Sequence, residues 1–219
     1  MPFTTRSVLT VLLLAAAAVL PAAPASARIV EIGKTANEQA PSCPSDPCQA
    51  VSRTTGYQAK VGADRAIFTA PADGKIVAWS ISLGKPGPQQ IEFFKRNYGG
   101  DARAGISVLK PGTKLFGRVT GQSPIRNLAP YFGQTVQFPL GRTLNVRKGY
   151  LVALTVPSWA PALALGMGND TSWRASRRRG RCADTDGQTA QLRLKSLAQY
   201  RCLYRTARLT YSATLVTNP

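Results

Sequence analysis

The chain has 219 residues, with 28 lysines and arginines against 10 aspartates and glutamates, a net charge of +18, and no histidine. The lack of histidine excludes a Ser-His-Asp triad, a Cys-His pair and a zinc site with histidine ligands. An apolar fraction of 44% with 17% charged residues is typical of a folded domain rather than of a disordered chain. Composition therefore predicts a folded and strongly basic protein.

The N-terminus has the pattern of a secretory signal peptide. Arg6 supplies a positive charge, and residues 8–20 form an uncharged apolar run that is too short to span a bilayer. The Ala-Ser-Ala sequence at 25–27 matches a cleavage site, and an uncleaved N-terminal anchor is the alternative. We therefore expect residues 1–27 to be removed. The mature chain would be secreted, begin at Arg28, carry a net charge of +17 and contain no transmembrane segment.

The four cysteines fit the oxidising compartment that export implies. They allow three pairings, and closeness in the sequence favours Cys43–Cys48 and Cys182–Cys202. A four-thiolate zinc site and a redox dithiol are the alternatives. The spacings C-x4-C and C-x19-C match the C-x2-C motif of neither. We expect two local disulfides, no metal and no cofactor.

The mature chain contains segments in which apolar and polar side chains alternate, as they do in half-buried strands. In chain order these segments are 77–83, 106–108, 136–140, 152–156 and 209–215. Turn-forming residues rich in proline and glycine separate them. Short helical pieces are expected at 36–40 and 92–97, and residues 192–203 fit neither period.

Two tryptophans differ in their expected positions. Trp79 shares one face of its predicted strand with Val77 and Ile81, which indicates a place in the core. Trp159 follows Pro157, which indicates a loop.

Strands separated by turns, with little helical pattern, predict an all-β protein. The fold we expect is a single jelly-roll-like antiparallel β-sandwich with short irregular or helical insertions. The expected parts are a signal peptide at 1–27, an N-terminal arm at 28–47 and a sandwich domain at 48–219.

Two stretches resemble elements of exported actinobacterial β-sandwich proteins. Phe68-Thr-Ala-Pro-Ala-Asp-Gly-Lys-Ile-Val-Ala-Trp79 is similar to an early strand pair of these proteins. Leu144-Asn-Val-Arg-Lys-Gly-Tyr-Leu-Val-Ala-Leu154 is similar to their extended segment, basic-glycine turn and apolar strand. The resemblance covers most of the mature chain and implies a jelly-roll-like fold. It implies no catalytic or binding residue.

Basic residues concentrate between positions 173 and 208, where ten stand against two acidic residues. Guanidinium groups bind phosphate, sulfate and carboxylate in a bidentate manner, and a tryptophan beside them suits stacking on a sugar or a base. A solvated basic loop without a ligand is the alternative. The candidate residues for contact with a polyanion or a glycan are Trp173, Arg174, Arg177, Arg178, Arg179 and Arg181.

The acidic residues give weaker indications. Asp184-Thr-Asp186-Gly187 has half the pattern of a calcium loop, but the missing oxygen ligands and the basic surroundings favour a simple turn. Glu92, Asp101 and Asp170 are candidate carboxylates for glycoside hydrolysis, although no spacing unites them.

The sequence therefore predicts a secreted, non-catalytic binding or structural module that contacts polyanions through its arginine-rich loop. The alternatives are a carbohydrate-binding module and, less favoured, a carboxylate-based glycoside hydrolase.

Overall fold

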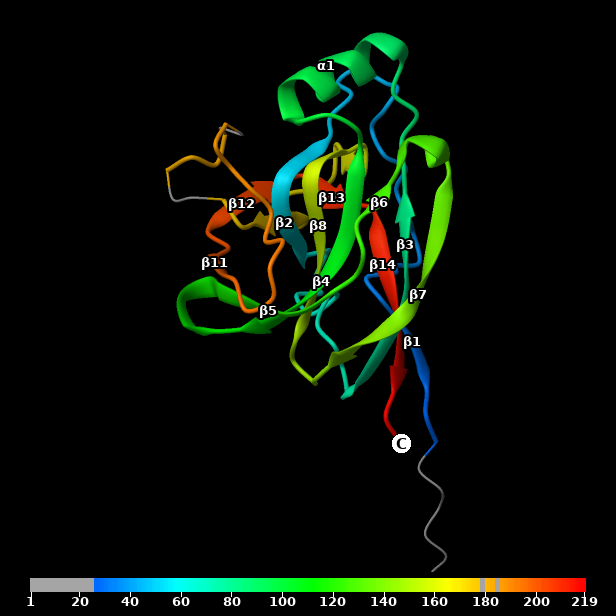
Figure 1. Ribbon diagram of the computed structural model, residues 1–219, viewed down its shortest axis with the longest axis vertical. Coiled ribbons are helices and arrows are strands. Elements are labelled where there is room, and N and C mark those ends of the chain that lie inside the picture. The colour runs from blue at the N-terminus through cyan, green and yellow to red at the C-terminus, as the bar shows by residue number, and fades with distance from the viewer. Residues whose placement is uncertain (1–25, 178–179, 184–185) are drawn as a thin grey trace, which may run out of the picture.

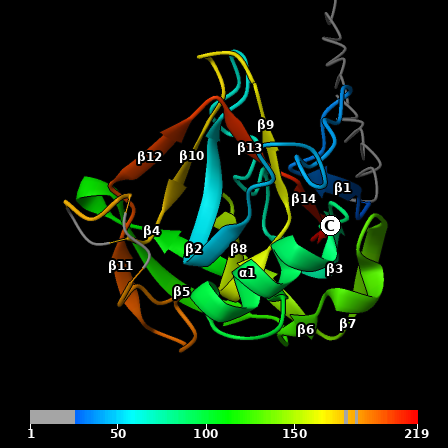
Figure 2. The same ribbon diagram turned by 90° about the horizontal axis from the view of Figure 1, so that it is seen from above.

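The computed structural model describes residues 26–177, 180–183 and 186–219, so most of the predicted signal peptide lies outside the described residues. Two antiparallel sheets face each other across a shared core (Figure 1; Figure 2). The smaller sheet has the order β1-β14-β3-β7, and the larger one has the order β11-β5-β4-β8-β2-β10-β12. The predicted all-β sandwich is confirmed.

The smaller sheet consists of β1 Ile29–Ile32, β14 Tyr211–Thr217, β3 Gly74–Ser82 and β7 Thr135–Val146. The larger sheet consists of β11 Leu197–Gln199, β5 Phe116–Gln122, β4 Arg103–Pro111, β8 Leu151–Ala160, β2 Val51–Lys60, β10 Ser172–Ala175 and β12 Cys202–Arg205. The remaining strands are β6 Arg126–Asn127, which pairs with β4, and the pair β13 Ala207–Leu209 and β9 Leu163–Leu165. Two short 3-10 helices lie at Thr113–Leu115 and Ala129–Tyr131.

The core lies between the inner faces of the two sheets. Trp79 and Ile81 of β3 are completely buried, and so are Val152 and Val156 of β8. These are the apolar members of the alternating segments, and burying such side chains is the main favourable contribution to folding. The predicted core position of Trp79 is confirmed.

The helix α1, Pro88–Tyr98, covers one end of the sandwich (Figure 1). It begins with a proline at its first position and ends at Gly99, whose φ of 92° suits a left-handed C-terminal cap. Its buried residue Phe94 packs on Trp159 of β8, with 4.9 Å between the ring centroids. The helical segment predicted at 92–97 is therefore confirmed within a longer helix.

Trp159 lies in a strand, so its expected position in a loop is wrong. The pairing of β8 with β2 passes from Thr54 opposite Val156 to Ser52 opposite Trp159, which leaves a bulge at Pro157. Arg53 has a positive φ of 45° at this point. Proline lacks a backbone N–H, and a bulge is a place where a strand tolerates this loss. The strand therefore continues beyond the proline.

The segment 28–47, expected to be an arm, contributes one strand to the sandwich. Its strand β1 pairs with β14 at the edge of the smaller sheet, and Ile32 belongs to the core. The helical piece expected at 36–40 does not form, and Glu38 forms an ion pair with Arg208. The guanidinium of Arg208 lies 3.1 Å from the Glu38 carboxylate and donates a hydrogen bond to the carbonyl of Gly33.

Both predicted disulfides, Cys43–Cys48 and Cys182–Cys202, are confirmed. Disulfides of this kind persist in an oxidising environment. Within the described ranges, no helix has the length and apolar character needed to cross a membrane.

The two disulfides should differ in their effect on stability. In the chain-entropy model, closing the short loop stabilises the fold by about 2 kcal/mol and closing the longer one by about 3 kcal/mol. Replacing Cys182 and Cys202 by serine should therefore lower the urea midpoint more than replacing Cys43 and Cys48. An equal or reversed order in urea unfolding would contradict this expectation.

Candidate anion-binding site

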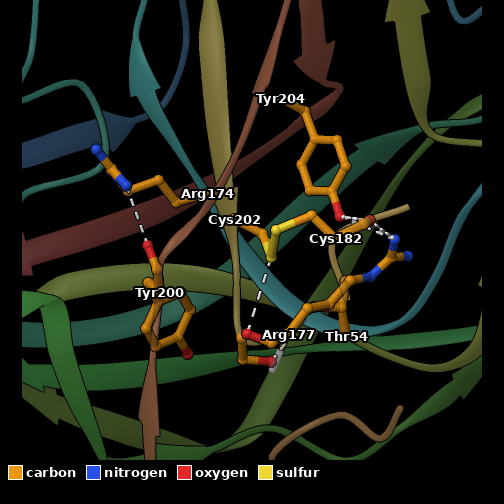
Figure 3. The surroundings of a disulfide bond; sticks show 8 residues. Thr54, Arg174, Arg177, Cys182, Tyr200, Cys202 and Tyr204 are labelled. Carbon is orange, nitrogen blue, oxygen red and sulfur yellow. Dashed lines mark hydrogen bonds between the residues drawn. A yellow bond between two sulfur atoms is a disulfide. The ribbon is translucent and has the colours of Figure 1, made fainter. Parts of the chain in front are cut away.

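The strands β10 and β12 pair so that Trp173 lies opposite Tyr204, and Ala175 lies opposite Cys202. The chain leaves β10 into a long connection, residues 176–201, which includes β11. The disulfide at Cys182 fixes this connection to the start of β12 (Figure 3). We call β10, β12 and the connection 176–201 the basic end of the molecule. It lies at the side of the larger sheet away from the smaller one (Figure 1).

Arg177 is buried at the base of this connection, with 8% of its surface exposed. Its guanidinium donates hydrogen bonds to the carbonyl of Cys182 at 3.0 Å, to the hydroxyl of Tyr204 at 2.9 Å and to the carbonyl of Ser52 at 3.0 Å. No carboxylate of the described residues pairs with it. Arg177 is therefore a structural link, because its donors bind three segments of the protein, and its predicted contact with an anion stays a prediction.

Trp173 is also buried, with 4% of its surface exposed. Its ring stacks on Tyr204, with 4.4 Å between centroids and 21° between planes. Burial raises the pKa of the Tyr204 hydroxyl, and the nearby Arg177 opposes this shift. Trp173 thus packs against Tyr204 with little of its surface exposed, and its predicted stacking on a ligand stays a prediction.

The other predicted site residues do not gather at one point. Arg174 is half-buried and donates a hydrogen bond to the carbonyl of Tyr200 at 3.1 Å (Figure 3). Arg181 is exposed, and its guanidinium lies 3.5 Å from the carbonyl of Asp186. Arg178 and Arg179 lie outside the described residues.

A buried polar network holds the rest of the connection against the larger sheet. The side-chain amide of Gln191 donates to the carbonyls of Ser196 at 3.1 Å and Gly117 at 3.4 Å, and its oxygen accepts from the Tyr200 hydroxyl. The backbone N–H of Gln191 donates to the Thr55 hydroxyl at 3.0 Å. Burial raises the pKa of Tyr200 well above its ordinary value, which keeps this donor protonated. The Cys182–Cys202 disulfide and Arg177 hold the first part of the connection, and the Gln191 network holds its later part.

The candidate residues predicted from the sequence do not include the cations that the disulfide, Arg177 and the Gln191 network leave exposed. The exposed basic side chains from the later part of the basic end are Arg193, Lys195, Arg201 and Arg205. The neighbouring strand β5 adds Arg118, which is exposed and donates to the carbonyl of Lys195 at 3.0 Å. Residues 187–219 contain no aspartate or glutamate, a signal that is present in the sequence itself. One-sided charge of this kind produces a positive local potential.

A hollow of about 450 Å³ opens beside the buried arginine. Its lining includes Tyr98, Trp173, Arg177, Tyr204 and Arg205 and contains no carboxylate. Because Trp173 and Tyr204 stack on each other, each ring offers at most one face to the hollow.

The carboxylates that the sequence singled out lie in different places. Glu92 is on α1, and Asp170 is in the loop before β10. The Asp101 carboxylate is 2.8 Å from the ammonium of Lys95, and this hydrogen-bonded ion pair lowers the pKa of Asp101. The Asp186 carboxylate lies 3.7 Å from Arg53, whereas Asp184 is outside the described residues.

No family model, curated protein or solved structure matches the chain.

Arg177 should matter for stability far more than the other arginines near it. Arg177→Ala removes the three hydrogen bonds of a buried guanidinium, although the Cys182 carbonyl still accepts one from the Tyr204 hydroxyl. We therefore expect a loss of about 2 kcal/mol or more of unfolding free energy. Arg174→Ala removes one hydrogen bond from a half-exposed side chain and should cost about 1 kcal/mol or less. Urea unfolding of both variants measures the difference. Equal stabilities would show that Arg177 is not a structural link.

Gln191 should hold the connection in place. Gln191→Leu leaves the buried Tyr200 hydroxyl unpartnered, which costs about 1–3 kcal/mol and loosens the connection. Trypsin should then cut faster after Arg193 and Lys195. Gln199→Leu is the control, because its amide bonds only the carbonyl of Lys114 near the surface. If both variants are cut at the wild-type rate, the network does not restrain this segment.

Proposed function

We propose that the chain is an exported, non-catalytic module that binds polyanions through the exposed cations of the basic end. The observation that carries the proposal is the charge distribution. Arg193, Lys195, Arg201 and Arg205 are exposed, and residues 187–219 contain no aspartate or glutamate to neutralise them. Such a surface attracts phosphate, sulfate and carboxylate groups.

The frame beneath these cations supports the proposal. The Cys182–Cys202 disulfide, the buried guanidinium of Arg177 and the Gln191 network hold the connection against the larger sheet. A surface that is already ordered loses less conformational entropy on binding than a flexible loop does. Binding therefore needs little rearrangement of the backbone at the basic end.

Charge contacts of this type have a defined physical behaviour. Each phosphate that a cation neutralises releases condensed counterions, so affinity falls as the salt concentration rises. Phosphate contacts position a protein without reading a sequence. We therefore expect weak discrimination between polyanions of similar charge density.

The alternative functions receive less support from the geometry. A carbohydrate-binding module needs free aromatic faces, but Trp173 is buried and stacked on Tyr204. A glycosidase acid needs a raised pKa, whereas Lys95 lowers the pKa of Asp101. Asp101 is therefore unsuited to donate a proton to a leaving group.

Export is part of the proposal. The signal-like pattern of residues 1–27 supports it, and so do the two disulfides, which suit an oxidising environment. Removal of the leader would leave a mature chain beginning at Arg28.

The decisive experiment compares two variants of equal net charge on immobilised double-stranded DNA. One replaces Arg193, Arg201 and Arg205 by serine. The control replaces Lys34, Lys75 and Arg147, three exposed cations on or beside the smaller sheet, by serine. The first variant should lose up to about three units of the log–log slope of affinity against salt. The control should retain most of the wild-type slope.

Both variants should unfold at nearly the wild-type urea concentration, because exposed charges contribute little to stability. If the two variants elute at the same salt concentration, binding follows net charge alone, and the basic end is not the binding surface.

A further inference from the structure

A second feature is a groove of about 590 Å³ between the larger sheet and the second half of β7, which shares only Leu194 with the basic end. Residues 102–169, which supply all but one of its lining side chains, contain no aspartate or glutamate. The lining consists of Thr120, Gly121, Gln122, Ser123, Pro124, Arg126, Gly141, Arg142, Thr143, Leu144, Asn145 and Leu194. A volume in this range suits a ligand of two to three sugar units rather than a single ion.

The wall formed by β7 is interrupted at the groove. Pro139 pairs with Ala78 of β3, and the next paired residue of β7 is Leu144, opposite Ile76. Residues 140–143 therefore face the single residue between Ala78 and Ile76. Such bulges redirect side chains and occur beside binding sites. Here the bulge carries Arg142, which is exposed and lines the groove.

The opposite wall carries a second arginine. Arg126 lies on β6, which pairs with β4, and its guanidinium carbon lies 5.9 Å from the centroid of the Phe138 ring. Within the described part of the chain, neither Arg126 nor Arg142 has an ion-pair partner. Two exposed cations that line one groove give it a positive local potential, which attracts an anionic group.

The remaining lining residues indicate what the anion is attached to. Thr143 and Asn145 are exposed in the groove and supply a hydroxyl and an amide. The amide nitrogen of Gln122 is engaged with Ser107 and with the carbonyl of Gln191, which fixes the orientation of its side chain. Amides and hydroxyls match the donors and acceptors of sugar hydroxyl groups. Leu194 adds an apolar contact at the rim.

We infer that this groove binds an acidic saccharide, with its carboxylate, phosphate or sulfate held by Arg126 and Arg142 and its hydroxyl groups by Thr143 and Asn145. The site differs from the basic end in that it recognises a short ligand. Binding there does not depend on Arg193, Arg201 or Arg205.

The experiment titrates the protein with trigalacturonate in a calorimeter and compares the neutral trisaccharide maltotriose and inorganic sulfate. Trigalacturonate should bind, and the double variant Arg126→Gln with Arg142→Gln should weaken it at least tenfold, as loss of bidentate charged contacts implies. The serine variant of Arg193, Arg201 and Arg205 should bind it as the wild type does. This control separates the groove from the polyanion surface.

Several results would overturn the inference. Equal binding of maltotriose would show that the arginines do not select the ligand, and equal binding of sulfate would show that the sugar is not recognised. Unchanged affinity of the glutamine double variant, with wild-type urea stability, would place the ligand elsewhere. If trigalacturonate does not bind at millimolar concentration, glucose 6-phosphate and glucose 6-sulfate are titrated next. If neither of these binds, the site is rejected.

Discussion

A buried guanidinium group that donates to three oxygen acceptors is the interaction on which the basic end depends. Arg177 joins β2, the start of the connection and β12 by donating to Ser52, Cys182 and Tyr204. Burying a cation costs free energy unless hydrogen bonds replace its hydration. Oxygen acceptors from three segments supply these bonds only when the segments are assembled. The arginine therefore links the position of the connection to the integrity of the larger sheet, and the adjacent disulfide closes the same region covalently.

Arginines in this chain have two separate roles. Arg177 and Arg208 are buried and each fixes a segment, the connection in one case and residues 33–38 in the other. Each keeps its Nε buried and without a hydrogen-bond partner, which shows that their contacts use the outer nitrogens of the group. Arg201 and Arg205 remain exposed beside them and produce the positive potential. The arginines of this chain thus include buried residues that link segments and exposed residues that supply surface charge. Only the exposed arginines can bind a polyanion.

The fold was largely predictable because alternation reports burial on one face. Trp79 and Ile81 alternate with polar residues and are buried, as expected. The strand β2 gave no such signal, since the larger sheet is covered on both faces there and Thr54, Thr55 and Gln58 are buried with hydrogen bonds.

The site was less predictable than the fold. Five arginines within eight residues cannot be told apart in the sequence. Arg177 differs from the others that the structure describes because it is buried and donates to Ser52 and Tyr204, which lie far from it in the sequence. The lack of aspartate and glutamate in residues 187–219 was visible in the sequence and indicated the exposed cations better than the arginine run did.

Hydrogen exchange with mass spectrometry, measured with and without inorganic polyphosphate, tests the central claim most directly. If the basic end binds polyanions, amides between residues 190 and 205 should gain protection at low salt and lose it at high salt. Peptides from β3 and β14 in the smaller sheet should exchange at the same rate in both conditions. Protection that appears on β3 and β14 instead, or that is unaffected by salt, would contradict the account.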